Sequence, residues 1–202
     1  MKTGKEYVES LRNRKIAVYL FGEEVKNPVD HPVIKPSVNS VSVTYDIAHD
    51  KRYASLATAT SHLTGNRINR FTHIHQNTED LVKKVKLLRL MGQKTGACFQ
   101  RCVGMDAINA LSSITYEADQ KQGTEFHKRF TEFLKQVQND DLVCCGAMTD
   151  PKGDRSLAPS EQADPDLYLR IVEKRDDGIV VRGSKVHQTG AIISHEVIVM
   201  PT

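Results

Sequence analysis

The sequence predicts an α+β fold in which a helical part, residues 1–141, precedes the first strands of a β-domain, residues 142–202. In the first part the apolar residues recur at steps of three and four, which is the period of an amphipathic helix. After about residue 142 they alternate instead, which is the period of a strand. A segment rich in Pro, Gly and Asp, residues 146–166, indicates a long loop, and such loops are usually functional or disordered.

Composition and charge exclude several classes of protein. Of the 202 residues, 39% are hydrophobic and 26% are charged, which is typical of a globular chain. The net charge of +3 is too small to indicate a nucleic-acid partner, although it would tolerate an anionic cofactor. No apolar run is long enough to span a membrane. The N-terminus lacks the apolar core of a secretory signal, so we expect the four cysteines to be reduced thiols in the cytoplasm.

The elements at the start of the chain follow from spacing and from turn residues. Helices are expected over residues 3–13 and 37–57, because apolar residues there recur at helical spacing. An apolar strand or extended piece is expected over residues 15–25. The three prolines of residues 27–37 predict an ordered loop or linker, and residues 64–71 are expected to form a turn with an extended flank.

The strongest helical pattern lies in the middle of the chain. Asn77 or Thr78 can cap a helix, and Glu79 and Asp80 would follow in its first turn, where acidic residues favour the helix dipole. Steps of three and four then place one stripe of side chains on a single face: Leu81, Val85, Leu88, Met91, Thr95, Cys98, Cys102, Met105, Asn109, Ser112 and Tyr116. The stripe is too long for an ordinary helix, and its glycines suggest close packing or breaks, at Gly92, Gly96 and Gly104. A further amphipathic helix is expected over residues 124–139.

The C-terminal part is predicted to be the beginning of a sheet. Two strand-like segments, residues 167–174 and 178–185, flank Asp176-Asp177-Gly178, which is a hairpin signal. Residues 191–200 are expected to form a further strand or a pair of strands. Because a small open sheet with an apolar edge is a poor place to end, we expect an N-terminal portion of a longer protein or completion by a second chain.

Two cysteines in the stripe are candidate metal ligands. Cys98 and Cys102 are four residues apart, so on a helix both thiols would project from one face and could reach one metal centre. Two ligands do not complete a site, and buried free cysteine is common, so the spacing alone favours packing over metal binding. His73 and His75 could also form a metal pair, but we interpret them as surface histidines before a helix cap. Cys144 and Cys145 are interpreted as packing residues.

Longer motifs around the cysteines indicate a family. The segments GQKTGACFQRCVGMDAINAL, AMTDPKGDRSLAPS and DGIVVRGSKVHQTG closely resemble the 4-hydroxybutyryl-CoA dehydratases, which also isomerise vinylacetyl-CoA. The resemblance runs from Tyr7 to Pro201 and covers less than half of the usual length of that family. A looser similarity, in TGNRINRF and NTEDLVKK, extends to flavin-dependent 4-hydroxyphenylacetate 3-monooxygenases. The cysteine pair of CFQRC favours the dehydratases, since the hydroxylases need no cluster.

The resemblance implies a fold, cofactors and partners. The fold would be acyl-CoA-dehydrogenase-like, with an N-terminal helical domain, a middle antiparallel β-domain and a C-terminal helical domain absent here. The cofactors would be FAD and a [4Fe-4S] cluster, with Cys98 and Cys102 as two cluster ligands and a histidine and a third cysteine outside this sequence. The substrate would be a CoA thioester, dehydrated to crotonyl-CoA through a ketyl radical, and the protein a homotetramer with flavin sites between subunits.

The resemblance also assigns roles to individual residues. Gln100 would face the substrate, and Thr189 would offer its hydroxyl to the flavin ring from a strand. Gln100 on a helix would point 100–200° away from the cysteine face, so a packed amide is an equal reading. The other expected flavin contacts lie in two segments: Met148, Thr149, Asp150, Pro151, Lys152, Gly153, Asp154 and Arg155, and His187 with Gln188. An acidic turn and an ordinary strand threonine are the alternatives.

Two rival functions remain at this point. The first is the oxygenase component of a flavin-dependent aromatic hydroxylase. The second is an inert fragment with no enzymatic role, because two cluster ligands and the main acid/base residues would lie outside the 202 residues. We expect no turnover from this chain alone.

Overall fold

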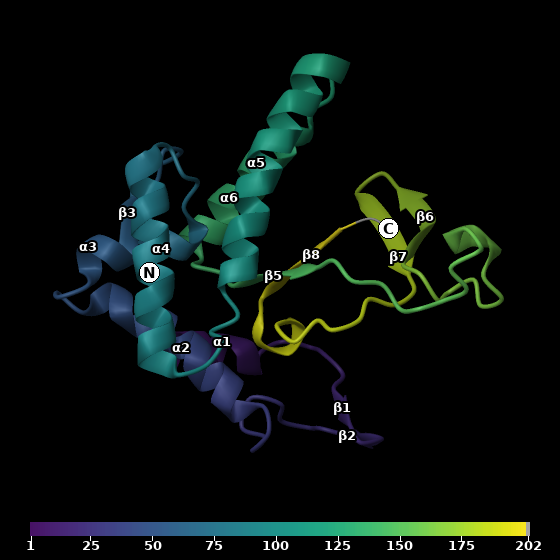
Figure 1. Ribbon diagram of the computed structural model, residues 1–202, viewed down its shortest axis with the longest axis horizontal. Helices are drawn as coiled ribbons and strands as arrows, with labels where there is room; N and C mark the ends of the chain where they lie inside the picture. Colours follow the sequence, from purple (N-terminus) through teal and green to yellow (C-terminus); the bar gives the residue numbers. More distant parts are fainter. Residues whose placement is uncertain (201–202) are drawn as a thin grey trace.

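The computed structural model describes residues 1–200; Pro201 and Thr202, the last residues of the expected β-domain, lie outside the described part. Among residues 1–200, six α-helices gather on one side of the molecule, and all of them precede residue 140 (Figure 1). Their bounds are α1 Gly4–Arg12, α2 Lys35–His49, α3 Ala54–Ala57, α4 Thr78–Thr95, α5 Cys102–Gln122 and α6 Phe126–Asn139. In the described part of the chain, no helix has both the length and the apolar character needed to cross a membrane.

The strands form four separate pairs. Three pairs are antiparallel: β1 Tyr19–Leu20 with β2 Glu23–Glu24, β3 Thr58–Thr60 with β4 Arg67–Asn69, and β6 Arg170–Arg175 with β7 Gly178–Arg182. The fourth pair, β5 Cys144–Ala147 with β8 Glu196–Val199, is parallel and aligns Cys144 with Glu196. Short 3₁₀ helices occur at η1 Arg70–Thr72, η2 Pro159–Glu161 and η3 Ala191–Ile193. The fold is therefore mixed helix and strand, as the sequence predicted.

The first helix forms where the sequence placed it. Thr3 and Glu6 make a reciprocal capping box at the N-terminus of α1. Tyr7, fully buried, stacks on Tyr45 of α2 with ring centroids 4.9 Å apart. Its hydroxyl donates to the carbonyl of Ile193, 2.7 Å away in η3. One buried side chain thus joins α1, α2 and the C-terminal part of the chain.

Two expectations near the N-terminus are only partly correct. The helix expected over residues 37–57 is interrupted, because α2 ends at His49 and the chain turns before α3. The strand expected over residues 15–25 is a short hairpin, in which Phe21 and Gly22 turn the chain with φ of 54° and 87°. Two-residue strands bury little, so apolar spacing alone did not distinguish this hairpin from a single strand.

The long stripe is broken at the glycine that the sequence pointed to. Gly96 adopts a left-handed conformation with φ of 60°, and its N–H donates to the carbonyl of Gly92 at 3.0 Å, which ends α4. Residues 97–101 are not helical, and α5 begins only at Cys102. The expectation that Cys98 and Cys102 share one helical face is therefore wrong.

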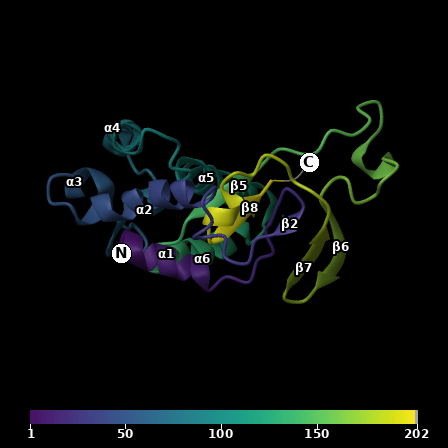
Figure 2. The same cartoon turned by 90° about the horizontal axis from the view of Figure 1, so that it is seen from below.

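The C-terminal part projects from the helices. The predicted hairpin is confirmed as β6–β7, with Arg175 opposite Gly178 across the turn. Figures 1 and 2 both show this hairpin and the loop before it extending away from the helical side. The segment expected to be strand over residues 191–200 is η3 followed by β8. The β5–β8 pair is held against the helices through Val143 and Ile193, which belong to the same buried cluster as Tyr7.

Candidate functional site

The linker between α4 and α5 carries the first group of candidate residues. Phe99 and Arg101 point into the protein, where they are 7% and 2% exposed, and the Phe99 ring lies 5.7 Å from that of Phe71. Cys98 between them and α4 is exposed, and Gln100 is half-buried with φ of 55°. Phe99 and Arg101 thus face inward while Cys98 faces outward, so the linker is a non-helical segment anchored at two points.

The two thiols remain neighbours although they share no helix. Cys102 is half-buried at the first position of α5, and Cys98 is exposed. Burial raises the pKa of the Cys102 thiol, the nearby Cys98 thiol raises it further, and hydrogen bonds from the Val103 and Cys102 N–H groups lower it. These amides are the free N–H groups of a helix start, which stabilise a thiolate. The linker and the start of α5 therefore carry two thiols close enough for the charge of one to affect the other.

A complete metal site is not present in the described residues. Across residues 1–200, no three His, Cys, Asp or Glu side chains gather so that they could hold a metal ion. A [4Fe-4S] cluster normally takes four protein ligands, so this pair would supply two of them. The donor type fits an iron–sulfur cluster, because thiolates are its usual ligands, and the exposed position of Cys98 leaves the pair accessible from outside.

Gln100 connects the linker to the second candidate segment. A Cβ placed on Gly190 would lie 3.6 Å from Gln100 Oε1 and 3.1 Å from the Cβ of Cys145. Gly190 is buried, whereas Thr189 just before it is exposed. The amide of Gln100 therefore lies against the end of the segment that contains Thr189, at an ordinary van der Waals distance from a Cβ at Gly190.

The second segment has a different backbone from the one expected. Thr189 lies in a turn before η3, so the expectation of a strand threonine is wrong. His187 is exposed with φ of 60°, and Gln188 donates from Nε2 to the carbonyl of Val186 at 2.7 Å. The Gln188 carbonyl accepts the N–H of Ala191 at 2.9 Å. Both His187 and Thr189 thus present their side chains outward from a hydrogen-bonded loop.

The third segment, residues 148–155, lies beside the second at its start. The N–H of Val186 donates to the carbonyl of Thr149 at 3.0 Å. Lys185 forms an ion pair with Asp150 at 2.6 Å and also reaches the carbonyl of Met148 at 3.4 Å. Pro151 and Lys152 follow this pairing in the chain. The structure therefore brings Met148–Asp150 next to the segment that leads to Thr189.

The end of the third segment folds on its own loop. A Cβ on Gly153 would lie 2.3 Å from Gln162 Oε1, so this position is packed tightly against the later part of the loop. Asp154 accepts a hydrogen bond from the N–H of Ser156 at 2.9 Å, as the alternative of an acidic turn predicted. Arg155 is exposed, and no ion pair joins it to another part of residues 1–200.

Two other sequence interpretations have different outcomes. Cys144 and Cys145 are buried, in agreement with packing, and burial raises the pKa of the Cys144 thiol to about 12. The expectation that His73 is a surface residue is wrong, because it is 3% exposed and its Nε2 lies 2.9 Å from Asp80. Asp80 also pairs with the buried Arg70 at 3.0 Å. Alternation in the sequence gave no sign of this ion pair.

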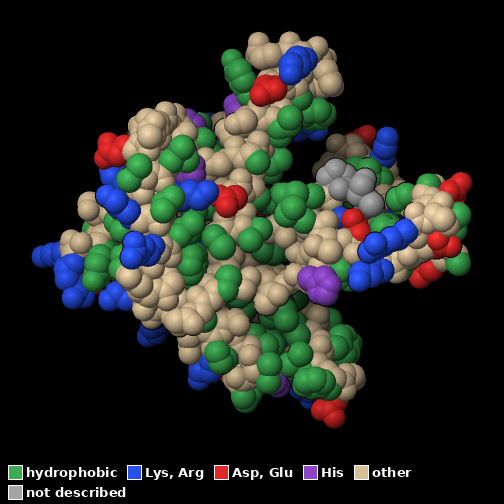
Figure 3. Space-filling model, in the orientation of Figure 1, with side chains coloured by type: hydrophobic (Ala, Val, Ile, Leu, Met, Phe, Trp, Pro, Cys, Tyr) green, Lys and Arg blue, Asp and Glu red, His purple; other side chains and the backbone are tan. Residues whose placement is uncertain are grey.

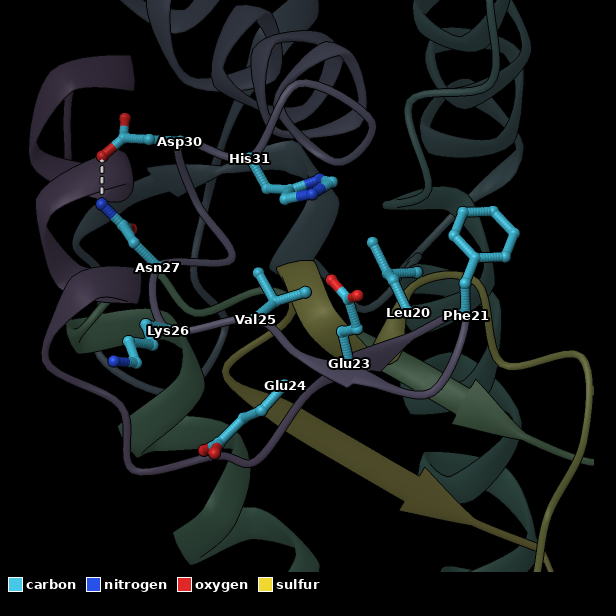
Figure 4. Close-up of a pocket in the computed structure, with 9 residues that line it drawn as sticks. All are labelled: Leu20, Phe21, Glu23, Glu24, Val25, Lys26, Asn27, Asp30 and His31. Carbon is cyan, nitrogen blue, oxygen red and sulfur yellow. Dashed lines mark hydrogen bonds between the residues drawn. The ribbon is translucent and has the colours of Figure 1, made fainter.

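A separate hollow lies away from the three segments. It has a volume of about 630 Å³ and lies between β1–β2 and the loop before α2 (Figure 4). Figure 4 shows the His31 ring and Leu20 on its wall, with Phe21 at the turn of the hairpin. None of the site residues predicted from the sequence lines this hollow.

Comparison with known proteins identifies the family. Residues 3–202 match the family described as 4-hydroxyphenylacetate 3-hydroxylase N terminal. The chain belongs to this family. It is 63% identical over 202 residues to 4-hydroxybutyryl-CoA dehydratase/vinylacetyl-CoA-Δ-isomerase of Clostridium aminobutyricum, in a match covering 100% of this chain and 41% of that protein. It is 29% identical to a 4-hydroxyphenylacetate 3-monooxygenase oxygenase component of Thermus thermophilus, covering 100% of this chain and 40% of the relative.

Solved structures of this family have the same fold. An oxygen-tolerant archaeal 4-hydroxybutyryl-CoA dehydratase from N. maritimus superposes with a TM-score of 0.94 at 59% identity, over 100% of this chain and 40% of the other. The oxygenase component of 4-hydroxyphenylacetate 3-monooxygenase, complexed with FAD and 4-hydroxyphenylacetate, gives 0.78 at 28% identity, over 100% and 41%. The chain spans about two fifths of the length of these family members. The resemblance predicted from the sequence is confirmed.

Proposed function

We propose that these residues form the N-terminal part of a 4-hydroxybutyryl-CoA dehydratase with vinylacetyl-CoA isomerase activity, a hydro-lyase of the cytoplasm. The observation that carries the proposal is the presence of Cys98 in the linker and Cys102 at the start of α5, in a chain 63% identical to such an enzyme. The alternative within the family is an aromatic hydroxylase, whose relatives are less similar at 29% identity.

In this proposal the thiol pair holds one side of a [4Fe-4S] cluster. Hydrogen bonds from the N–H groups at the start of α5 lower the pKa of the Cys102 thiol against the larger raising effect of its burial, and the remaining ligands, a histidine and a cysteine, come from further chain. The cluster and FAD, when bound, supply Lewis-acid and one-electron chemistry for removing hydroxide from 4-hydroxybutyryl-CoA by way of a ketyl radical. The protein's contribution is to hold substrate and both cofactors in line.

The other candidate residues have binding and orienting roles in the proposal. Gln100 projects its amide beside Gly190 and faces the substrate, while Thr189 offers its exposed hydroxyl to the flavin. Residues 148–155 and His187–Gln188 contact the FAD, and the link between Thr149 and Val186 keeps the two segments together. Related structures that contain FAD support a flavin site in the full-length protein.

The larger assembly is also part of the proposal. We assign residues 1–141 to an N-terminal helical domain and residues 142–202 to the first part of a middle β-domain, in an acyl-CoA-dehydrogenase-like fold. A homotetramer would build the flavin sites between its subunits. The hairpin β6–β7 has large apolar side chains exposed at Ile171 and Ile179, which is consistent with further protein covering it.

The test compares two reactions of the full-length protein purified without oxygen. We expect conversion of 4-hydroxybutyryl-CoA to crotonyl-CoA, and we expect Thr189→Val to lower turnover and change the flavin absorption spectrum. Ser113→Ala, which removes an exposed hydroxyl from α5, is the matched control and should change neither. The 202-residue chain alone should give no turnover. Oxygen-dependent hydroxylation of a phenol, without dehydration, would contradict the proposal.

A further inference from the structure

The strongest unassigned feature is a buried ion pair directly beside the thiol pair. Arg101 is 2% exposed, and its guanidinium lies 2.5 Å from Asp141 Oδ1. The same group lies 4.2 Å from the centre of the Tyr45 ring and donates to the Thr44 hydroxyl at 3.3 Å. A buried charge is costly unless it is paired and hydrogen-bonded, so these contacts fix where Arg101 can lie.

Asp141 is itself held from several sides. The backbone N–H of Lys2 donates to Asp141 Oδ2 at 3.1 Å, and the Tyr45 hydroxyl donates to the Asp141 carbonyl at 2.8 Å. The residue has φ of 44° between the end of α6 and the start of β5. Asp141 therefore lies where the N-terminus, α2 and the start of β5 meet, and its hydrogen bonds hold it in place as an anchor for Arg101.

The anchored arginine controls the shape of the linker. Phe99 and Arg101 are buried on either side of Gln100. The backbone of Gln100 has a φ of 55°, which residues other than glycine rarely adopt. Strain of this kind persists only where surrounding contacts determine it. Cys102 follows Arg101 directly, and Cys98 precedes Phe99. The two anchors therefore determine how far the Cys98 sulfur lies from the Cys102 sulfur.

We propose that Arg101, through its ion pair with Asp141, is a positioning residue that keeps the thiols of Cys98 and Cys102 at the separation needed to bind one metal centre. The role of the pair as cluster ligands rests on the proposed function, but the positioning of the two sulfurs does not. Lysine cannot replace the arginine, because its single ammonium cannot donate to Asp141 and Thr44 while also stacking flat on Tyr45.

The test measures the thiol pair itself with a reagent that needs two neighbouring sulfurs. Phenylarsine oxide binds tightly only where one arsenic bridges two thiols, and mass spectrometry of peptides locates the bridge. In the full-length protein without its cluster, we expect a bridge between Cys98 and Cys102. Arg101→Lys and Asp141→Asn should weaken its formation by roughly tenfold or more, the scale seen when a group that orients a metal ligand is removed.

A matched control separates positioning from general loss of stability. Arg70 and Asp80 form another ion pair with a buried arginine, 3% exposed, whose side-chain partners lie in α3, β3 and α4 and not in the linker. Arg70→Lys should lower the thermal unfolding midpoint much as Arg101→Lys does, yet leave arsenical bridging and the iron content unchanged. Equal arsenical bridging in Arg101→Lys and the wild type would overturn the inference. An equal loss of bridging in Arg70→Lys and Arg101→Lys would also overturn it.

Iron analysis in the same experiment distinguishes the two proposals. Bridging in the wild type that is lost in Arg101→Lys, with no iron in any anaerobic preparation, would support positioning and contradict the proposed function. Iron in the wild type and undiminished iron and bridging in Arg101→Lys would support the function and contradict positioning. Loss of both bridging and iron in Arg101→Lys, with both kept in Arg70→Lys, is the result we expect.

Discussion

Single residues determine how closely α5 approaches the sheet. A Cβ on Gly104 would lie 2.0 Å from the carbonyl oxygen of Cys144, so no side chain fits at this crossing. The sequence indicated that Gly92, Gly96 and Gly104 mark close packing or breaks. Gly104 is a close contact and Gly96 is a break, but Gly92 meets nothing within 4 Å. Composition alone could not distinguish these three glycines, because a close contact depends on a neighbouring atom and a helix end depends on a φ value.

We predict opposite effects of adding one methyl group at two of these glycines. Gly104→Ala should push α5 away from β5 and lower the free energy of unfolding by about 1–3 kcal/mol, the usual cost of overpacking. Gly92→Ala, at an exposed position in the last turn of α4, should raise it by about 0.5–1 kcal/mol through helix propensity. Chemical unfolding of both variants checks this, and an unchanged Gly104→Ala midpoint would show that the helix can shift without cost.

At the scale of elements, local spacing predicted helices better than it predicted their limits. The apolar steps continue from Thr95 through Cys98 to Met105, although the backbone between them is not helical. The linker is determined by a left-handed glycine and by the contact of Arg101 with Asp141, forty positions further on. Likewise, the parallel pairing of β5 with β8 joins segments about fifty residues apart. Such contacts leave no periodic pattern in the sequence.

One of these long-range links should make stability depend on pH. His195, before β8, accepts the N–H of Val143 at Nδ1 and lies 2.8 Å from the Ser10 hydroxyl of α1. Burial, helped by the charges of Lys2 and Arg14, lowers its pKa from 6.5 to about 3. The unfolded chain therefore takes up a proton below pH 6.5 that the folded chain does not.

This difference gives the direction and size of the pH effect. The contribution of neutral His195 is complete above pH 6.5 and should fall by about 1.4 kcal/mol per pH unit as the pH drops toward 3. His195→Gln should remove this slope, while His49→Gln, at an exposed position of α2, should keep it. Unfolding midpoints between pH 7 and 4 measure it, and parallel curves for wild type and His195→Gln would show that the buried histidine is not the cause.

At the scale of the whole molecule, apolar side chains remain exposed on several elements. Figure 3 shows hydrophobic side chains across one face, with Lys and Arg gathered toward α3 and α4. On α4, Val85 is 65% exposed, and Ile179 of β7 is 56% exposed. A two-stranded hairpin alone is marginally stable, so β6–β7 needs further protein against it. The chain spans 41% of the length of its dehydratase relative.

The candidate site was predicted in part. Motif resemblance selected Cys98, Gln100 and Thr189, and the structure brings the linker and the turn at Thr189 together through Gln100 and Gly190. The local backbone of these segments was not predicted, because both are loops whose shape depends on tertiary contacts. Arg101 was missed for the same reason: a charged residue beside a cysteine has no special pattern until its buried partner is known.

The most direct test of the account is the iron and acid-labile sulfide content of the anaerobically purified full-length protein and its single cysteine variants. We expect about four iron atoms and four sulfides per subunit in the wild type, since one [4Fe-4S] cluster is expected. Both should be lost in Cys98→Ser and Cys102→Ser and kept in Cys145→Ser, which changes a buried thiol outside the pair. A wild-type protein without iron, or a full cluster in both Cys98→Ser and Cys102→Ser, would contradict it.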